Sequence, residues 1–218
     1  MRRLAALVAL AALVSAPAVG TRPAISVHAD AFEPPRAAPG ISPGAAGELR
    51  VVPGRSARSG AGPVLRYAVE VEGGLRVDPG GFALRVDEVL AHPRGWGGTD
   101  RVSFRRVSSG PFDFRVTLAS PETTDRLCAP LETRARLSCA RDGRAVLNAL
   151  RWEQGAQAFG GDLARYRAYL VNHEVGHLLG HGHRGCPAPG VRAPVMMQQT
   201  KGVGACRANP LPLQWERG

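Results

Sequence analysis

The sequence has very little lysine, few aromatic residues and no cysteine before Cys128. Lys201 is the sole lysine, so arginine supplies nearly all of the basic charge, and aromatic residues make up 6% of the chain. No apolar run approaches the roughly 20 residues that a membrane-spanning helix needs, and no basic stripe carries interleaved aromatic residues. We therefore expect neither a transmembrane span in the mature chain nor a nucleic-acid partner.

The first eighteen residues have the pattern of a secretory signal peptide. Residues 1–3 are a short positive segment, residues 4–14 are an unbroken apolar run, and residues 16–18 place small side chains around a cleavage site. We expect cleavage after Ala18 and a secreted, extracellular protein. A retained anchor is the alternative, but eleven apolar residues are too few to span a bilayer. The absence of an early cysteine also excludes a lipoprotein.

Residues 19–62 are rich in proline, glycine and alanine and show neither a strand-like nor a helical apolar period. Such a segment buries too little apolar surface to offset its conformational entropy, so we expect a disordered linker. Residues 63–218 then form one domain, which is long enough for a sizeable core.

Apolar periodicity within residues 63–218 predicts a mixture of strands and helices, and hence an α+β fold. Ser120 followed by proline has the pattern of a helix start, and Asp162 is the expected cap of a long central helix that is apolar on nearly every side. The expected strands are residues 64–72, 102–107, 112–119 and 145–152, and the expected helices are residues 82–90, a segment after Ser120, and residues 163–179.

Near the end of that central helix, the sequence places the residues of a metal site. His173 and His177 are four residues apart, so both imidazoles leave the same face of a helix. Gly180 can end the helix and turn the chain so that His183 supplies a third nitrogen. Three nitrogens and one open position are typical of catalytic Zn²⁺. Glu174 lies beside this face, where it can reach a metal-bound water without being a ligand.

Two other interpretations of this segment remain open from the sequence. If the helix continued past Gly180, His181 would replace His183 as the third ligand; Gly180 and Gly182 favour the break. A histidine-rich helix end without metal is the other alternative. It explains neither Glu174 nor the placement of the glycines.

The spacing His173-Glu174-x-x-His177-x-x-Gly180-x-x-His183 resembles the extended zinc signature of the metzincin metallopeptidases. More narrowly, residues 62–212 are similar to the secreted DUF3152 family, notably in residues 93–96, 113–118 and 193–200. The resemblance implies a metzincin-like fold, in which a twisted mixed sheet packs on a central active-site helix and is followed by a methionine turn.

The resemblance also implies roles for residues away from the histidines. Met196, with Met197 beside it, matches the methionine that lies beneath zinc in metzincins, while no tyrosine follows Tyr169 to act as a switching ligand. The strand before the zinc helix would form the edge of the substrate cleft and pair with a bound peptide. The residues expected on that edge are Asn148, Ala149, Leu150 and Arg151. An ordinary strand within the sheet is the alternative for them.

The four cysteines of a chain with a signal peptide are expected to form two disulfides. Proximity in the sequence favours Cys128–Cys139 and Cys186–Cys206, although three pairings are possible. The second bridge would close a loop around the two methionines. Zinc binding by the cysteines is disfavoured, because their spacing matches no known zinc-ligand pattern.

The sequence therefore predicts a secreted, monomeric zinc endopeptidase that binds one Zn²⁺ and hydrolyses protein or peptide substrates, with Glu174 as the proton acceptor. The alternative is a non-catalytic extracellular module in which zinc is structural. The net charge of +10 adds a third hypothesis, binding to an anionic cell-wall polymer.

Overall fold

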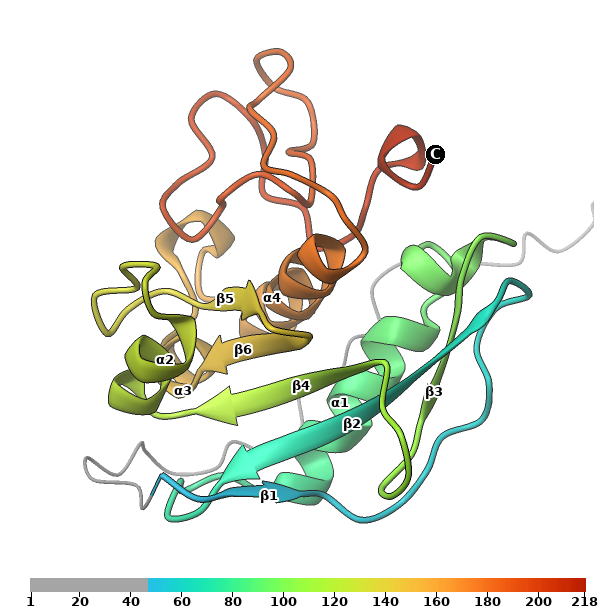
Figure 1. Cartoon of the computed structure of the whole chain (residues 1–218). Coiled ribbons are helices and arrows are strands. Elements are labelled where there is room, and N and C mark those ends of the chain that lie inside the picture. The colour runs from blue at the N-terminus through green and yellow to red at the C-terminus, as the bar shows by residue number, and fades with distance from the viewer. Residues whose placement is uncertain (1–46) are drawn as a thin grey trace, which may run out of the picture. The chain divides into compact units, whose positions relative to one another are not determined.

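The computed structural model describes residues 47–218 (Figure 1). The predicted signal peptide and most of the predicted linker lie outside the described residues. The strands are β1 (Leu49–Val51), β2 (Val64–Glu72), β3 (Ser103–Arg106), β4 (Phe114–Ala119), β5 (Cys139–Arg141) and β6 (Arg144–Asn148). The α-helices are α1 (Pro79–Ala91), α2 (Pro121–Cys128), α3 (Ala149–Gln154) and α4 (Leu163–Leu178), and the 3-10 helices are η1 (Trp96–Gly98), η2 (Gln157–Phe159) and η3 (Gln214–Glu216).

The six strands form one mixed sheet in the order β1-β2-β4-β6-β5, with β3 also paired to β2. Strands β3, β2, β4 and β6 run parallel, whereas β1 and β5 pair antiparallel to their neighbours. Strand β2 is long enough to pair with β3 at its start and with β1 at its end. The strand order ends at the short strand β5, which forms one edge of the sheet.

One face of the sheet carries the main apolar core. The side chains of Val69, Val116 and Leu147 are fully buried on this face, as expected from the alternating pattern of their strands. Helices α1 and α4 contact each other and cover this face (Figure 1). The predicted helix within residues 163–179 is confirmed, and its cap is also confirmed, because Asp162 accepts a hydrogen bond from the Arg165 amide.

The opposite face is covered at one end by α2. Proline at the first helical position and the Ser120 hydroxyl, which accepts from the Thr123 amide, start this helix as the sequence predicts. The Cys128–Cys139 disulfide joins α2 to β5 and lies in a small apolar cluster with Val146. This bridge and Cys186–Cys206 confirm both predicted pairings.

The predicted start of the domain at residue 63 is wrong. Strand β1 pairs with the end of β2, Val52 is buried in the main core, and Ser59 forms a β-bridge with Phe104. Residues 47–62 therefore belong to the fold. A three-residue strand is too short to show an apolar period, which explains why the sequence pattern missed it.

The predicted strand through Asn148, Ala149, Leu150 and Arg151 is also wrong. Strand β6 ends at Asn148, whose side chain accepts from the Leu150 amide and starts α3. This is the usual action of asparagine at a helix N-cap, and the residues that follow it are good helix formers. None of the four residues is on the sheet edge, because Asn148 ends β6, which lies between β4 and β5, and the other three belong to α3.

After α4, residues 179–218 contain only one short 3-10 helix, η3. Several buried polar side chains here bond to the backbone instead of to each other. Gln199 bonds the backbone of Pro194 and Asn209, and the Glu216 carboxylate accepts from the amides of Val195 and Met196. In the described part of the chain, no helix is long and apolar enough to cross a membrane.

Candidate metal centre

Helix α4 carries the candidate centre and is enclosed by its surroundings. His173 and Glu174 are 5% and 4% exposed, respectively, and the indole of Trp96 donates to the carbonyl oxygen of Asn172 from the α1 side. A helix buried on nearly every side holds its side chains in one arrangement, which favours a preorganised site.

Hydrogen bonds to backbone carbonyls orient two of the imidazoles. His173 Nδ1 lies 2.8 Å from the Val195 oxygen, and His177 Nδ1 lies 2.9 Å from the His181 oxygen. A carbonyl oxygen only accepts, so each Nδ1 carries the proton and donates it. In the neutral rings, each Nε2 then has a free lone pair, which is the form that binds metal.

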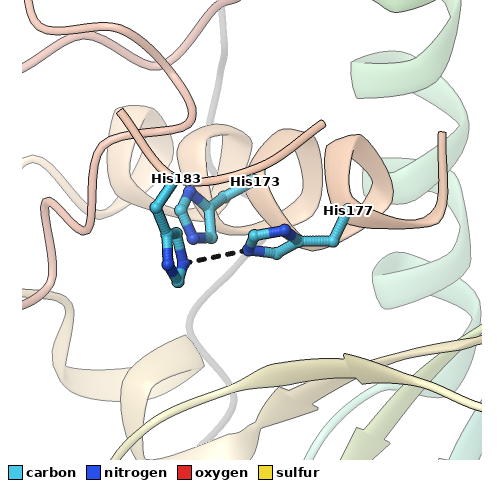
Figure 2. Close-up of side chains that lie close together, drawn as sticks. All are labelled: His173, His177 and His183. Carbon is cyan, nitrogen blue, oxygen red and sulfur yellow. Dashed lines mark hydrogen bonds between the residues drawn. The ribbon is translucent and has the colours of Figure 1, made fainter. Parts of the chain in front are cut away.

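The chain turn after α4 brings the third imidazole into place. The Gly180 amide donates to the His177 carbonyl and the His181 amide to the Gly176 carbonyl, which together form a Schellman motif. Gly180 has φ +91°, a conformation that favours glycine, as the sequence predicts. The chain therefore reverses, and His183 faces His173 and His177 (Figure 2).

The three rings converge closely enough to share one ion. His177 Nε2 and His183 Nε2 are 3.1 Å apart, and one ligand atom from each of the three histidines lies within 4.8 Å of the others (Figure 2). Two nitrogens on a tetrahedral zinc, each at about 2.0–2.1 Å, are about 3.3 Å apart. The His177–His183 pair therefore already has the spacing of two zinc ligands.

Burial keeps these imidazoles neutral. It lowers the pKa of His173 from 6.5 to about 3, with a further lowering by the nearby His177 and His183. Burial also lowers the pKa of His177, and that of His183, where the charges of His177 and Lys201 add to the effect. Neutral imidazole is the species that coordinates a metal.

Glu174 lines the same cavity as the histidines. Burial raises the pKa of its carboxyl from 4.5 to about 8. Among residues 47–218, no group donates a hydrogen bond to this carboxyl, so it is available to a molecule in the cavity. A cation bound by the histidines would favour its ionised form.

The cavity has a volume of about 500 Å³ and is lined by residues of α4 and of the edge strand β5. One wall consists of His173, Glu174, His177 and His183, and the adjoining wall of Gln198, Thr200 and Lys201. The opposite wall consists of residues 131–133 and 137–140, which include two residues of β5. The predicted cleft residues 148–151 do not line the cavity.

Met196 packs against α4 at Gly176, the residue before His177. A side chain at Gly176 would place its Cβ only 2.4 Å from the Met196 sulfur, so the glycine allows this close approach. Met196 is 1% exposed, whereas Met197 is half-buried and its backbone accepts from the Tyr169 hydroxyl. Of the two methionines, Met196 therefore packs directly on the helix that carries two of the three candidate ligands.

His181 is not part of the group of three. Its ring stacks on Trp96 with a centroid separation of 4.4 Å, and its backbone oxygen, not its ring, contacts His177. The alternative ligand set with His181 therefore requires a rearrangement of this stack.

Several supporting residues have no recognisable pattern in the sequence. Glu216 fixes the backbone at Val195, whose carbonyl orients His173. Tyr169 accepts from the Gln199 amide and so ties the segment after Met197 to α4. These contacts join residues 20 or more positions apart, so no local sequence pattern predicts them. The one signal in the sequence is a polar residue among apolar neighbours, which needs a hydrogen-bond partner if it is buried.

The comparisons with known proteins give one match. The family model described as "Protein of unknown function (DUF3152)" matches residues 37–212, which is most of the chain. No curated protein and no solved structure matches the chain. The match begins before the described residues and ends beyond the methionines, and therefore includes the three histidines and Glu174; the chain belongs to the DUF3152 family.

Proposed function

We propose that this protein is a secreted zinc-dependent endopeptidase. The observation that carries the proposal is the convergence of His173, His177 and His183 on one point, with the carboxyl of Glu174 in the same cavity. A structural zinc site usually has four protein ligands, whereas three ligands beside an open cavity are typical of catalytic sites.

The donor set suits zinc. Three neutral imidazoles bind Zn²⁺ well, and two of them are oriented through Nδ1 by backbone carbonyls, the supporting contacts that zinc-bound histidines usually have. Zinc held there would supply a Lewis acid for a peptide carbonyl and lower the pKa of a bound water to about 7.

Glu174 is the proton carrier in this proposal. Its carboxylate accepts a proton from the attacking water and passes it to the leaving amine. The enclosed setting supports this role, because a carboxyl with a raised pKa both holds and releases a proton near neutral pH.

Strand β5 is the proposed edge for the peptide backbone, in place of residues 148–151. It is an edge strand, and Cys139 and Ala140 line the cavity opposite the histidines. An extended peptide that pairs with β5 would place its carbonyl groups between β5 and the ligands. The close packing of Met196 on Gly176 supports the metzincin-like interpretation of this region.

Secretion is part of the proposal as well. The two disulfides favour an oxidising compartment, in agreement with the signal-peptide pattern.

The decisive experiment measures zinc content and casein hydrolysis in parallel. We expect about one zinc per chain in both wild type and Glu174→Gln, with hydrolysis in the variant at least about a hundredfold slower, because general acid–base catalysis contributes that much. His177→Ala should lose both zinc and activity. Equal hydrolysis by wild type and Glu174→Gln would overturn the mechanism.

Chelation separates this proposal from a non-catalytic zinc module. If zinc is catalytic, its removal should abolish hydrolysis and leave the circular dichroism spectrum nearly unchanged. If zinc is structural, its removal should unfold the domain.

A further inference from the structure

The cavity contains one lysine, and it has no ionic partner within residues 47–218. Lys201 lines the wall next to His183, and no acidic side chain among residues 47–218 pairs with its ammonium group. Glu132, an acidic residue of the opposite wall, pairs with Arg134 at 3.4 Å. The cavity therefore presents one uncompensated positive charge beside the candidate metal ligands.

We propose that Lys201 selects substrates with an acidic side chain close to the scissile bond. The inference rests on the proposed peptidase function and names the substrate class for that site. An anionic side chain that enters the cavity would meet the Lys201 ammonium, whereas a basic one would be repelled.

The backbone of Lys201 is held in a fixed position relative to α4. The Lys201 amide donates to the Gln198 carbonyl in a turn, and the preceding residue, Thr200, shares a hydrogen bond of 3.0 Å with the Tyr166 hydroxyl. The Gln199 amide donates to the Tyr169 hydroxyl at 2.8 Å. Both tyrosines belong to α4, one turn or two before His173, so the wall that carries Lys201 and the ligands share one support.

The opposite wall suits a side chain with an apolar stem. Leu131 and Leu137 line it, and Leu131 is 52% exposed, so its side chain is accessible to a molecule in the cavity. Glutamate combines methylene groups, which can contact these leucines, with a carboxylate for Lys201. We therefore expect glutamate to be favoured over its neutral isostere glutamine.

The test uses a casein-derived peptide with the residues around its cleaved bond replaced one at a time by Glu or Gln. At one position, wild type should favour Glu over Gln in kcat/KM by about fivefold, the upper range for one exposed ion pair. Lys201→Met should remove this preference and Lys201→Glu should reverse it, whereas Lys201→Arg should keep most of it. Arg94→Met, which removes an exposed charge outside the cavity, is the matched control and should behave like wild type.

A binding measurement separates this inference from the proposed function. Fluorescence anisotropy with zinc-loaded Glu174→Gln uses casein-derived peptides in which each position in turn carries Glu or Gln, so that no cleavage site needs to be known. At one position the Glu peptide should bind more tightly than the Gln peptide, and the double variant Glu174→Gln/Lys201→Met should lose this preference. That result supports the inference even if wild type cleaves nothing, an outcome that would overturn only the peptidase proposal. Equal Glu and Gln values in both assays, or no detectable peptide binding at all, would overturn the role of Lys201.

Discussion

Residues 47–178 and residues 179–218 are stabilised in different ways. The first part contains the whole sheet, α1 to α4, and a continuous apolar core. The second part has a single 3-10 helix, and the Cys186–Cys206 bridge and buried polar side chains that bond to the backbone hold its loops. In the first part, backbone ladders between strands satisfy most polar groups of the sheet; in the second part, isolated backbone hydrogen bonds are supplemented by buried side chains such as those of Gln199 and Asn209.

The candidate metal centre lies where the two parts meet. His173 and His177 come from α4, whereas His183 and the carbonyls that orient the other two rings come from the second part. Each part alone supplies an incomplete set of ligands. The loop part therefore decides the geometry of the site, although the helix supplies most of its chemistry.

The largest expected effect is a pH-dependent loss of stability in the metal-free Glu174→Gln variant, because two opposing titrations nearly balance in the wild type. The pKa of His173 is about 3 in the folded protein, whereas its ordinary value is 6.5. As the pH falls, the imidazole is therefore protonated in the unfolded chain before it is protonated in the folded protein. Its contribution is therefore present above about pH 6.5 and is lost as the pH falls toward 3. The Glu174 carboxyl has a folded pKa of about 8 and acts in the opposite direction: its contribution is present below about pH 4.5 and is lost as the pH rises through 8.

In chelator-treated wild type, the two effects should nearly cancel between pH 7 and pH 4. Glu174→Gln removes one of them, so its free energy of unfolding should fall by about 3 kcal/mol more than that of wild type over this range. Urea unfolding at several pH values measures the difference. Adding His173→Gln to Glu174→Gln should make the free energy of unfolding nearly independent of pH again. Parallel plots of the free energy of unfolding against pH for wild type and Glu174→Gln would contradict the prediction.

A slightly smaller effect is expected from Glu216→Ala, because the hydrogen-bond partners of the Glu216 carboxylate all lie within the second part. The Glu216 carboxylate accepts from the amides of Val195, Met196 and Leu213, and its loss leaves these groups unpaired. We expect a loss of about 2–3 kcal/mol in the free energy of unfolding and weaker zinc binding, because the Val195 carbonyl orients His173. Urea unfolding and competition with a zinc chelator measure both, with Glu216→Gln as the milder control. Unchanged zinc affinity would show that the two parts are not coupled in this way.

The smallest difference should appear between the two disulfides. The sequence separations of 11 and 20 residues predict similar losses of about 2–3 kcal/mol when each pair is replaced by serine. Zinc affinity should distinguish them: Cys186→Ser with Cys206→Ser should weaken it, since that loop contains no strand or helix to hold it. Cys128→Ser with Cys139→Ser should leave zinc affinity nearly unchanged, because β5 stays paired with β6. The reverse order of zinc affinities would contradict the comparison.

The sequence predicted best where a local pattern has a local cause. The helix of residues 163–179, its Asp162 cap, the turn at Gly180 and the strand of residues 64–72 all follow from apolar spacing or from one residue's conformational freedom. The prediction failed at residues 148–151, where an apolar run suited both a strand and a helix and the Asn148 cap decided. It failed again at β1, which is too short to have a period.

By itself, the sequence determined which residues could be ligands and that His173, Glu174 and His177 share one helical turn, because helical spacing is fixed by the backbone. Only the tertiary structure decided that β5 borders the cavity, that Met196 packs on Gly176, and that Lys201 and His183 line the same cavity. Those placements depend on contacts between segments far apart in the chain. Their physical basis is the docking of the loops on α4, through buried hydrogen bonds whose partners no local pattern specifies.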